Sequence, residues 1–369
     1  MTRQSCRIGY SVFISFSLAC ALGTAHARTA EDYYQQHNLV SDGGVAADHT
    51  DANLVNAWGI AFNPTGVAWV ADNGTGSSTL YDGSGTAQSL VVQIPAPGAA
   101  SGGTPTGIAF NGSNGFVVSG TGGSGPARFI FATEDGIIAG WSPTADGTHA
   151  LTVVDNSATT HAVYKGLALS ANGNGAMLYA TDFHNARIDV FDSTFAAVSQ
   201  ASGAFVDPHM QSGFAPFGIA AIGGDLYVTF AKQDSAGHDE VDGAGLGYVD
   251  AFDPNGQLLG RIASRGRLNA PWGVALAPAG FGRFSNALIV GNFGDGRINA
   301  FDPIFRVPLG QLSDQNGKPI QIEGLWGLAF GNGFANQPVN TLFFAAGPSD
   351  ESHGLYGRLD PVDSDNDGE

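Results

Sequence analysis

A short glycine-led unit recurs six times along this chain and limits the folds that it can adopt. The first copy runs from Asn56 to Asn63, with the sequence Asn-Ala-Trp-Gly-Ile-Ala-Phe-Asn. The glycine that opens the apolar part of each copy recurs after 48 to 59 residues, at positions Gly59, Gly107, Gly166, Gly218, Gly273 and Gly327. A period of this length indicates a repeat architecture in which each copy forms one supersecondary unit.

Each copy contains short apolar runs that have the pattern of β-strands. The first run, such as Gly59-Ile-Ala-Phe62, suits a strand that is buried on both faces. A second run, such as Leu226–Thr229, follows it, and a third, such as Arg187–Asp192, alternates between apolar and polar residues. Five copies add a fourth run, as at Gly256–Ile262 and Ala196–Ser199. Six repeats of four strands predict an all-β fold, a six-bladed β-propeller.

The sixth copy lacks a fourth strand, because only a short acidic tail follows Gly354–Leu359. A spare strand-like segment, Tyr33–Ser41, precedes the first copy. Pairing this segment with the sixth copy would close the ring without leaving an exposed sheet edge. We therefore expect an N-terminal strand around Asn38-Leu-Val40 to complete the last blade.

The first 27 residues have the features of a Sec-type signal peptide. Arg3 and Arg7 precede an apolar stretch, residues 8–22, and Ala25-His-Ala27 resembles a leader-peptidase site. We expect cleavage after Ala27 and a secreted or periplasmic protein. A lipoprotein signal at Cys20 is the alternative reading of the same segment.

The remaining chain divides into a propeller at 28–361 and an acidic tail at 362–369. Both cysteines, Cys6 and Cys20, lie in the predicted leader, so the mature chain has no disulfide and its stability must come from an apolar core. No other long apolar run occurs, so we expect no membrane span. We also expect a monomer.

The charge balance of the chain narrows the choice of partners. The formal charge is −18, and loss of Arg3 and Arg7 with the leader makes it −20. A surface of this sign repels phosphate backbones, so we expect no nucleic-acid partner. Only 13% of the residues are charged and 54 are glycine, a composition typical of a globular β protein with many tight turns.

The residues just before the six glycines are mostly aromatic. Trp58, Phe217, Trp272 and Trp326 occupy four of these positions, and Lys165 occupies a fifth. One interpretation is that the rings pack as wedges between blades. In the other, they surround the mouth of the central channel and form a ligand-binding surface on which a flat or sugar-like ligand stacks.

Polar residues follow the second strands at the same end of the predicted ring. Asp72, Glu134, Asp182 and Asn292 offer oxygen ligands of the kind that Ca²⁺ or another divalent cation prefers. The alternative is turn chemistry, since Asp and Asn are common in hairpin turns. Candidate catalytic acids or bases are His184, His238 and Lys165. A 17-residue polar segment at Ala231–Gly247 is the longest insertion between strands, and long loops often carry function.

The repeat resembles the NHL type of six-bladed propeller, whose units read roughly Gly-Ile-Ala, Leu-Tyr-Val-Ala-Asp and Arg-Ile-x-Val-Phe. The chain is also similar to an uncharacterised family of exported bacterial propellers, some with PEP-CTERM sorting tails. Matching runs span most of the chain, as at Leu54–Ala61, Phe129–Gly136, His238–Asp242, Val290–Gly296 and Gly324–Gly327. This chain lacks such a tail. The resemblance implies a propeller fold and export, and it implies no activity.

Two functions fit these observations. The first is an exported binding or scaffold propeller that takes a protein or glycan ligand on its loop face. The second is a cation-dependent enzyme of the lactonase or lyase kind, with a metal on the central axis. The second interpretation depends on analogy of fold together with the oxygen ligands, and the sequence leaves open whether the protein is an enzyme.

Overall fold

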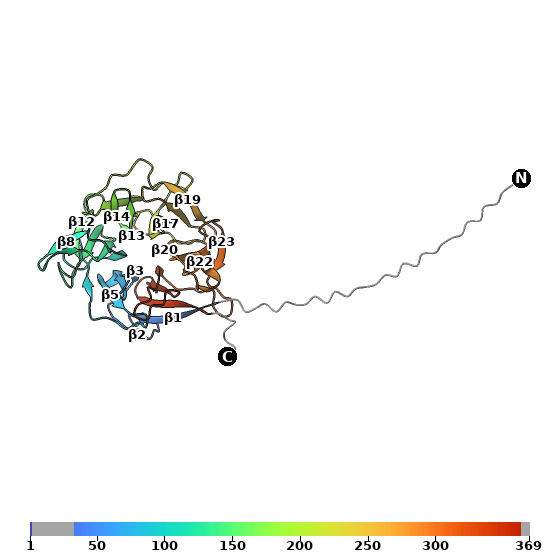
Figure 1. The fold of residues 1–369 in the computed structure, drawn as a ribbon, viewed down its shortest axis with the longest axis horizontal. Coiled ribbons are helices and arrows are strands. Elements are labelled where there is room, and N and C mark those ends of the chain that lie inside the picture. The colour runs from blue at the N-terminus through green and yellow to red at the C-terminus, as the bar shows by residue number, and fades with distance from the viewer. Residues whose placement is uncertain (2–32, 363–369) are drawn as a thin grey trace.

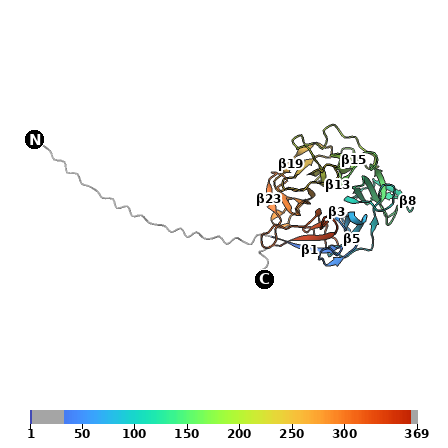
Figure 2. The same ribbon diagram turned by 180° about the vertical axis from the view of Figure 1, so that it is seen from behind.

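The fold was analysed in a computed structural model that describes Met1 and residues 33–362. The predicted leader beyond Met1, the alternative lipoprotein site at Cys20, and residues 363–369 of the predicted acidic tail lie outside these described residues. Six small sheets are arranged around one axis (Figures 1 and 2). The prediction of an all-β, six-bladed propeller is confirmed.

The blades follow one another in chain order, and within each blade the strands run from the innermost to the outermost. The sixth blade differs at its outer side, where β1 from the N-terminus follows β26. Blades one and two contain β3 (Ala57–Phe62), β4 (Ala68–Asp72), β5 (Ser77–Tyr81) and β6 (Val92–Gln93), then β7 (Pro105–Phe110), β10 (Phe129–Thr133), β11 (Ile137–Trp141) and β12 (Leu151–Asp155). Blades three and four contain β13 (Tyr164–Asn172), β14 (Gly175–Asp182) and β15 (Arg187–Asp192), then β16 (Phe214–Ile222), β17 (Asp225–Lys232), β18 (Gly247–Phe252) and β19 (Leu258–Ser264). Blades five and six contain β20 (Pro271–Leu276), β21 (Leu288–Asn292), β22 (Ile298–Phe301) and β23 (Pro308–Gln311), then β24 (Leu325–Phe330), β25 (Leu342–Ala346), β26 (Leu355–Val362) and β1 (Tyr33–Ser41).

The sixth blade is completed by the N-terminal strand, as predicted. Strand β1 pairs antiparallel with β26, in a register that runs from Tyr33 opposite Val362 to Ser41 opposite Leu355. Leu39 and Val40 are buried in this blade. The short strand β2 (His49–Thr50) adds a parallel pair at the outer edge. The two ends of the described chain thus hold the ring closed.

Two blades depart from the regular pattern. The predicted outer strand of blade three, Ala196–Ser199, is wrong: only an isolated bridge between Phe191 and Ala197 forms there. In blade two, a hairpin of β8 (Val117–Gly120) and β9 (Gly123–Pro126) is inserted between the first and second strands. Within the described residues, the only helices are the three-residue turns η1 (Asn73–Thr75) and η2 (Gly282–Phe284), and none is long or apolar enough to cross a membrane.

The repeated glycines allow the inner strands to approach one another closely. A Cβ added to Gly218 would lie 2.0 Å from the carbonyl oxygen of Trp272, which precedes the next glycine along the ring. The same relationship joins Gly327 of blade six to the carbonyl of Trp58 in blade one, at 2.3 Å. Any other side chain would collide with the neighbouring backbone. The glycine period is therefore a condition for six strands to surround one narrow axis.

The apolar core lies mainly between neighbouring blades. Trp69 of blade one stacks on Phe129 of blade two, with ring centroids 4.0 Å apart. A second cluster packs Tyr179 of blade three against residues of blade four, including Phe252. Each blade therefore buries one face against the next, so the core runs around the ring and leaves the loops at both ends of the axis free to carry function.

Candidate functional site

One end of the ring, which we call the loop face, carries the segments that lead into the inner strands and those that join second to third strands. The four aromatic residues predicted there meet on the axis. The rings of Trp58 and Trp326 have centroids 3.8 Å apart, and Trp272 lies 5.9 Å from Trp326. Phe217 lies 5.7 Å from Trp326. We call these four residues the aromatic plug.

The aromatic plug is buried. Trp58, Phe217 and Trp326 are at most 1% exposed, and Trp272 is 9% exposed. The rings pack against one another and close the channel, so Trp58, Phe217 and Trp326 offer no free face on which a ligand could stack, and of the four Trp272 alone borders the open cavity. Beyond Trp272, a cavity of about 250 Å³ is lined by the inner strands of all six blades.

The indole N–H groups of the plug are all hydrogen-bonded within the protein. Trp58 and Trp326 both donate to the side-chain oxygen of Asn56, at 2.9 and 3.2 Å. Trp272 donates to the main-chain carbonyl of Lys165, at 3.2 Å. Buried indoles need such partners. One asparagine on the first blade therefore fixes two rings of the plug.

Lys165 lies directly over the plug. Its Nζ is 5.1 Å from the centroid of the Trp58 ring and 2.5 Å from Oε1 of Glu134. Asp239 Oδ1 lies 3.4 Å from the same nitrogen. The Lys165 side chain is only 1% exposed. Burial of an ammonium is costly unless it is paired and hydrogen-bonded, and here one aromatic ring and two carboxylates supply that pairing.

Two further carboxyl groups surround this ammonium. Burial raises the pKa of Glu240 to about 8, against the opposing charge of Lys165. Burial and the charge of Glu134 raise the pKa of Glu351 to about 7. For Lys165, burial opposes the charge, but the carboxylates led by Glu134 outweigh it and raise its pKa. We call Glu134, Lys165, Asp239, Glu240 and Glu351 the axial cluster.

Asparagine side chains position two members of the axial cluster. Asn73 donates to Oε2 of Glu134 at 2.8 Å, and Asn56 donates to Oε2 of Glu351 at 2.8 Å. Both asparagines come from blade one, whereas the glutamates come from blades two and six. The cluster is therefore held by hydrogen bonds that cross between blades.

The long loop of blade four, residues 233–246, supplies Asp239 and Glu240 to the axial cluster. Its base is fixed by Gln233, which donates to the carbonyl of Phe183 at 2.6 Å. Asp234 accepts the main-chain N–H of His238 at 3.0 Å and so shapes the turn. Asp239 is 65% exposed, so the loop brings one carboxylate of the cluster within reach of solvent.

The predicted catalytic candidates lie at different distances from the axial cluster. Lys165 is its central residue. His238 lies at its edge, where Nδ1 is 2.8 Å from Oδ1 of Asp239. His184 lies beside the tip of the loop, since a Cβ added to Gly237 would be 3.3 Å from its Nδ1, whereas the hydrogen-bond partners of the Lys165 ammonium are Glu134 and Asp239.

Of the four residues predicted as metal ligands, only Glu134 lies in the axial cluster. Asp72 is buried within blade one, where Thr79 and Ser77 donate to it at 3.1 and 3.3 Å. Asp182 accepts from Asn185 at 2.7 Å in blade three.

Asn292, the fourth predicted ligand, donates to the carbonyl of Arg267 at 2.7 Å in blade five. Asp72, Asp182 and Asn292 thus bond to groups of their own blade or the segment leading into it, which is the turn chemistry left open as the alternative. The structure does not bring the four together.

A different trio has the spacing of a metal site. Glu134, His238 and Asp239 each place one ligand atom within 4.8 Å of the others. However, the ammonium of Lys165 already contacts both carboxylates, and Asn73 occupies the second oxygen of Glu134. A divalent cation here would face a buried positive charge at close range. The arrangement fits the lysine ammonium better than a resident Ca²⁺.

Sequence reasoning missed Asp239, Glu240, Glu351 and Asn56. A signal for two of them was present in the composition. The chain has 33 acidic residues but only six glutamates, and three of those six meet in the axial cluster. Aspartate is common in turns whereas glutamate is not, so a glutamate in a tight loop is the more informative residue.

Comparison with known proteins places the fold among propellers with diverse functions. No protein-family model matches the chain. A structural genomics protein of unknown function from Bacteroides thetaiotaomicron is 10% identical, with a TM-score of 0.56 over 89% of this chain and 77% of that one. A streptogramin B lyase is 13% identical, with a TM-score of 0.51 over 90% of this chain and 99% of that one. Similarity at this level shows the fold alone.

Relatives in sequence come from a giant virus. "Uncharacterized protein L690" of Acanthamoeba polyphaga mimivirus is 34% identical over 339 residues, which are 90% of this chain and 87% of the viral protein. "Uncharacterized protein R648" of the same virus is 33% identical over 339 residues, 90% of this chain and 81% of its own length. Membership of an exported bacterial group stays a prediction. The chain belongs to the same family as these two mimivirus proteins.

Proposed function

We propose that the protein is a binding propeller that takes a protein or glycan ligand on its loop face, through a positively charged group seated at the axial cluster. The supporting observation is the meeting of four carboxyl groups from blades two, four and six around the single ammonium of Lys165. Nothing in the packing of a propeller requires charges at this place. Strongly perturbed ionisable groups that converge in this way are typical of functional sites.

The sign of the site defines the chemistry of the ligand. Lys165 is buried, whereas Asp239 and its neighbour His238 are 65% and 50% exposed. An approaching ligand therefore meets carboxyl groups first, on a chain whose formal charge is −18. A ligand ammonium or guanidinium group carries half the charge of a divalent cation and can pair with the exposed Asp239, whose contact with Lys165 is the longer of the two at 3.4 Å; by displacing protons from Glu240 and Glu351 it gains further negative partners. Amino sugars and lysine or arginine side chains carry such groups.

The experiment compares two glycans that differ only in charge. Because Lys165 lies 5.1 Å from the Trp58 ring, occupation of the cluster is expected to change tryptophan fluorescence. We expect a saturable change with glucosamine oligomers and none with N-acetylglucosamine oligomers. Lysine-containing and norleucine-containing peptides form the matched pair for a protein ligand. If charged and neutral probes behave alike, or if Asp239→Asn leaves the response unchanged, the proposed function is wrong.

A second function, an enzyme of the lyase or lactonase kind, is favoured by one observation. The pKa values of Glu351, about 7, and Glu240, about 8, suit groups that give and take protons near neutral pH. In this version Lys165 stabilises negative charge on the substrate, and a glutamate acts as acid or base. The Lys165 ammonium thus takes the place of the axial metal in the cation-dependent enzyme that the sequence suggested.

Metal analysis separates the two versions of the enzyme. We expect the purified protein to contain no stoichiometric divalent cation, and its melting temperature to be unchanged by a chelator or by added Ca²⁺. If the wild-type protein retains a metal and the Glu134→Gln variant does not, the cation-dependent enzyme is supported instead. The role proposed for Lys165 is then wrong.

We also propose that the protein is exported as a monomer. The support is the sequence of residues 1–27, which resembles a Sec-type signal peptide. Expression in a bacterial host followed by mass spectrometry should give a product that begins at Arg28, in the periplasm or medium. A full-length product retained in the cytoplasm would contradict export, and light scattering of the product would test the monomer.

A further inference from the structure

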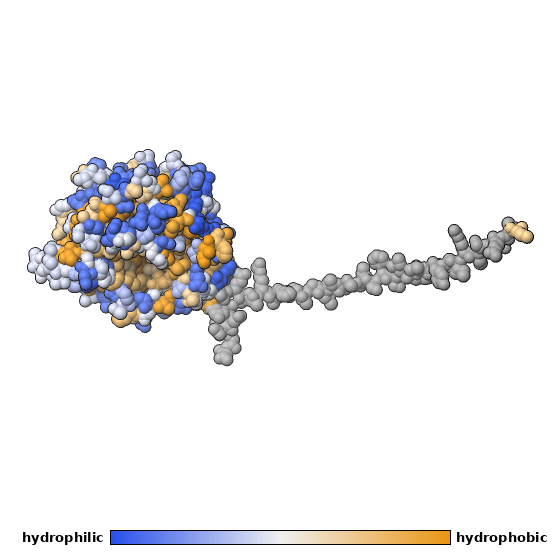
Figure 3. All heavy atoms as spheres, turned by 45° about the horizontal axis from the view of Figure 1, so that its top comes forward, coloured by the Kyte–Doolittle hydropathy of each residue, from blue (hydrophilic) through white to orange (hydrophobic). Residues whose placement is uncertain are grey.

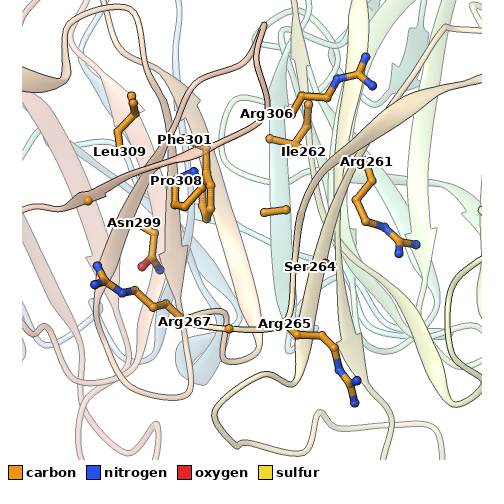
Figure 4. Close-up of a pocket in the computed structure, with 13 residues that line it drawn as sticks. Arg261, Ile262, Ser264, Arg265, Arg267, Asn299, Phe301, Arg306, Pro308 and Leu309 are labelled. Atoms are coloured by element: carbon orange, nitrogen blue, oxygen red, sulfur yellow. The ribbon is translucent and has the colours of Figure 1, made fainter.

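A groove on the outer wall of the ring combines positive charge with apolar surface. It lies between the outer strands of blades four and five, β19 and β23, and has a volume of about 580 Å³. Ile262 of β19, Pro308 of β23 and Phe301 of β22 line the middle of the groove, while Arg306 is at one end and Arg265 and Arg267 are at the other (Figure 4). We call this the arginine groove.

The concentration of charge in the arginine groove contrasts with the rest of the chain. Four of the chain's 15 Lys and Arg residues line it, on a protein whose formal charge is −18. One of the four, Arg261, has its charge compensated by buried carboxylates, because it pairs with Asp207 and with Asp250 Oδ1 at 3.1 Å. The remaining three line the groove without a carboxylate partner in the described structure.

These three arginines differ in what holds them. Arg306 donates to the carbonyl of Leu259 at 3.0 Å and so bridges blade five to blade four across the groove. Gly260 is needed for this contact, since a Cβ there would lie 1.9 Å from an Arg306 nitrogen. Arg265 and Arg267 are exposed, and within residues 33–362 their guanidinium groups make no hydrogen bond or ion pair. Two guanidinium groups are therefore available to a ligand.

Apolar side chains are exposed beside these charges. Leu309 and Leu259 are 42% and 41% exposed, and the turn before β23 exposes Val307, Phe305 and Ile304. In the space-filling view hydrophilic and apolar residues are interspersed over the face that is shown (Figure 3). Exposed apolar groups that adjoin a groove with charged walls are characteristic of interaction sites rather than of plain surface.

The two strands that border the groove are both sheet edges. Among the strands of residues 33–362, β19 pairs only with β18, and β23 pairs only with β22. Each therefore presents backbone N–H and C=O groups that an added extended segment can bond. A polyphosphate chain would satisfy the arginines but could use neither the apolar walls nor these edges.

We propose that the arginine groove binds an extended acidic peptide segment of a partner protein. One apolar side chain of the segment lies against Phe301 and Pro308, and its flanking carboxylates pair with Arg265 and Arg267. Charge complementarity favours this occupant, because the chain as a whole is acidic whereas four of its 15 Lys and Arg residues line this groove. This site is independent of the loop face and of the function proposed there.

The test is fluorescence anisotropy with a labelled heptapeptide in which Glu and Asp flank a central Phe. The groove variant is Arg265→Glu with Arg267→Glu. Its control is Arg297→Glu with Lys318→Glu, which changes the net charge equally at exposed positions outside the groove. We expect the groove variant to bind at least about tenfold more weakly, the control to bind as the wild type does, and binding to weaken as salt is added.

Other occupants give distinguishable results that would overturn the proposal. Equal binding of a peptide with Ser in place of Phe would mean that the groove attracts any polyanion. Tighter binding of a single-stranded oligonucleotide at the same residues would indicate nucleic acid. Self-association that is lost in the groove variant would make this face an interface between copies. No saturable peptide binding, with the wild type folded, would also refute it.

Discussion

The amide nitrogen of Asn56 donates a hydrogen bond to Oε2 of Glu351 at 2.8 Å, although the two residues are 295 positions apart in the chain. The oxygen of the same amide accepts hydrogen bonds from the indole N–H groups of Trp58 and Trp326. Protonation of Glu351 is thereby linked through one side chain to the rings that close the axis. A ligand that changes the charge of the axial cluster should consequently alter the hydrogen bonds that hold Trp58 and Trp326 in the aromatic plug.

The first prediction concerns pH. The folded-state pKa values of Glu240 and Glu351, about 8 and about 7, exceed their ordinary value of 4.5. The folded protein therefore holds these protons more tightly than the unfolded chain. Their contribution to the free energy of unfolding is fully present below pH 4.5 and is lost as pH rises to about 8. Melting temperature should fall over this interval.

Replacement of both glutamates by glutamine should flatten this dependence. We expect the Glu240→Gln and Glu351→Gln double variant to be the more stable protein at pH 8 and to lose less stability between pH 5 and pH 8. Glu323→Gln, outside the cluster, is the control. Asp250, whose pKa burial raises to about 7, contributes the same trend to all three proteins. Parallel melting curves for the double variant and wild type would contradict the prediction.

The second prediction concerns the ion pair of Lys165 and Glu134. Lys165→Met should destabilise the protein by about 3–5 kcal/mol, because Glu134 and Asp239 then lie together without the ammonium. Adding Glu134→Gln to the same chain should recover part of the loss. Chemical denaturation of the two single variants and the double variant measures the coupling. Additive losses would show that the two residues act independently.

The third prediction concerns the glycine ring. Gly218→Ala should cost about 2–3 kcal/mol, because the new Cβ would lie 2.0 Å from the Trp272 carbonyl and force the inner strands apart. Gly173→Ala is the matched control, since nothing lies within 4 Å of its Cβ position. Denaturant titration of both variants measures the difference. Equal stabilities would mean that the inner strands are not closely packed.

The fourth prediction concerns closure of the ring. A chain that starts at Asp42 lacks β1 and leaves β26 with an unpaired edge. We expect it to melt at lower temperature and to aggregate. A chain that starts at Tyr33 keeps the strand and should behave as the longer protein does. Thermal unfolding and light scattering distinguish the two, and a soluble, stable short form would show that closure is dispensable.

The sequence predicted the ring because its signals are local and repeated. Gly59 and its five counterparts mark inner strands that cannot bear a side chain, and the missing outer strand at Leu359 indicated the need for β1. Blade three shows the limit of this reasoning. Ala196–Ser199 has the composition of a strand, yet only a single bridge at Ala197 forms.

The candidate site was harder to predict because loops decide which side chains meet. Asp72, Asp182 and Asn292 end their second strands in one register, each opposite the residue two before the repeated glycine, but in blade two Thr133 holds this position and Glu134 is one residue further on. Asp72 accepts from Thr79 in its own blade, whereas Glu134 reaches Lys165 of the next. An offset of one residue changes the side to which a side chain points, and it is visible only when the strand register is known. Lys165 was found because it replaces an aromatic residue at a repeated position. Glu351 was missed because it lies within the connection of β25 to β26, and these connections between second and third strands differ in length from blade to blade, so the repeat gives it no equivalent position.

The aromatic plug closes the central channel of this propeller at the loop face. Solutes that enter the 250 Å³ cavity from the far end stop at Trp272, and those that arrive at the carboxyl groups above Trp58 stop on the other side of the same rings. The molecule consequently has two separate ends, a cavity lined by the inner strands and a cluster of ionisable side chains, which can be engaged at the same time by different molecules without any passage between them.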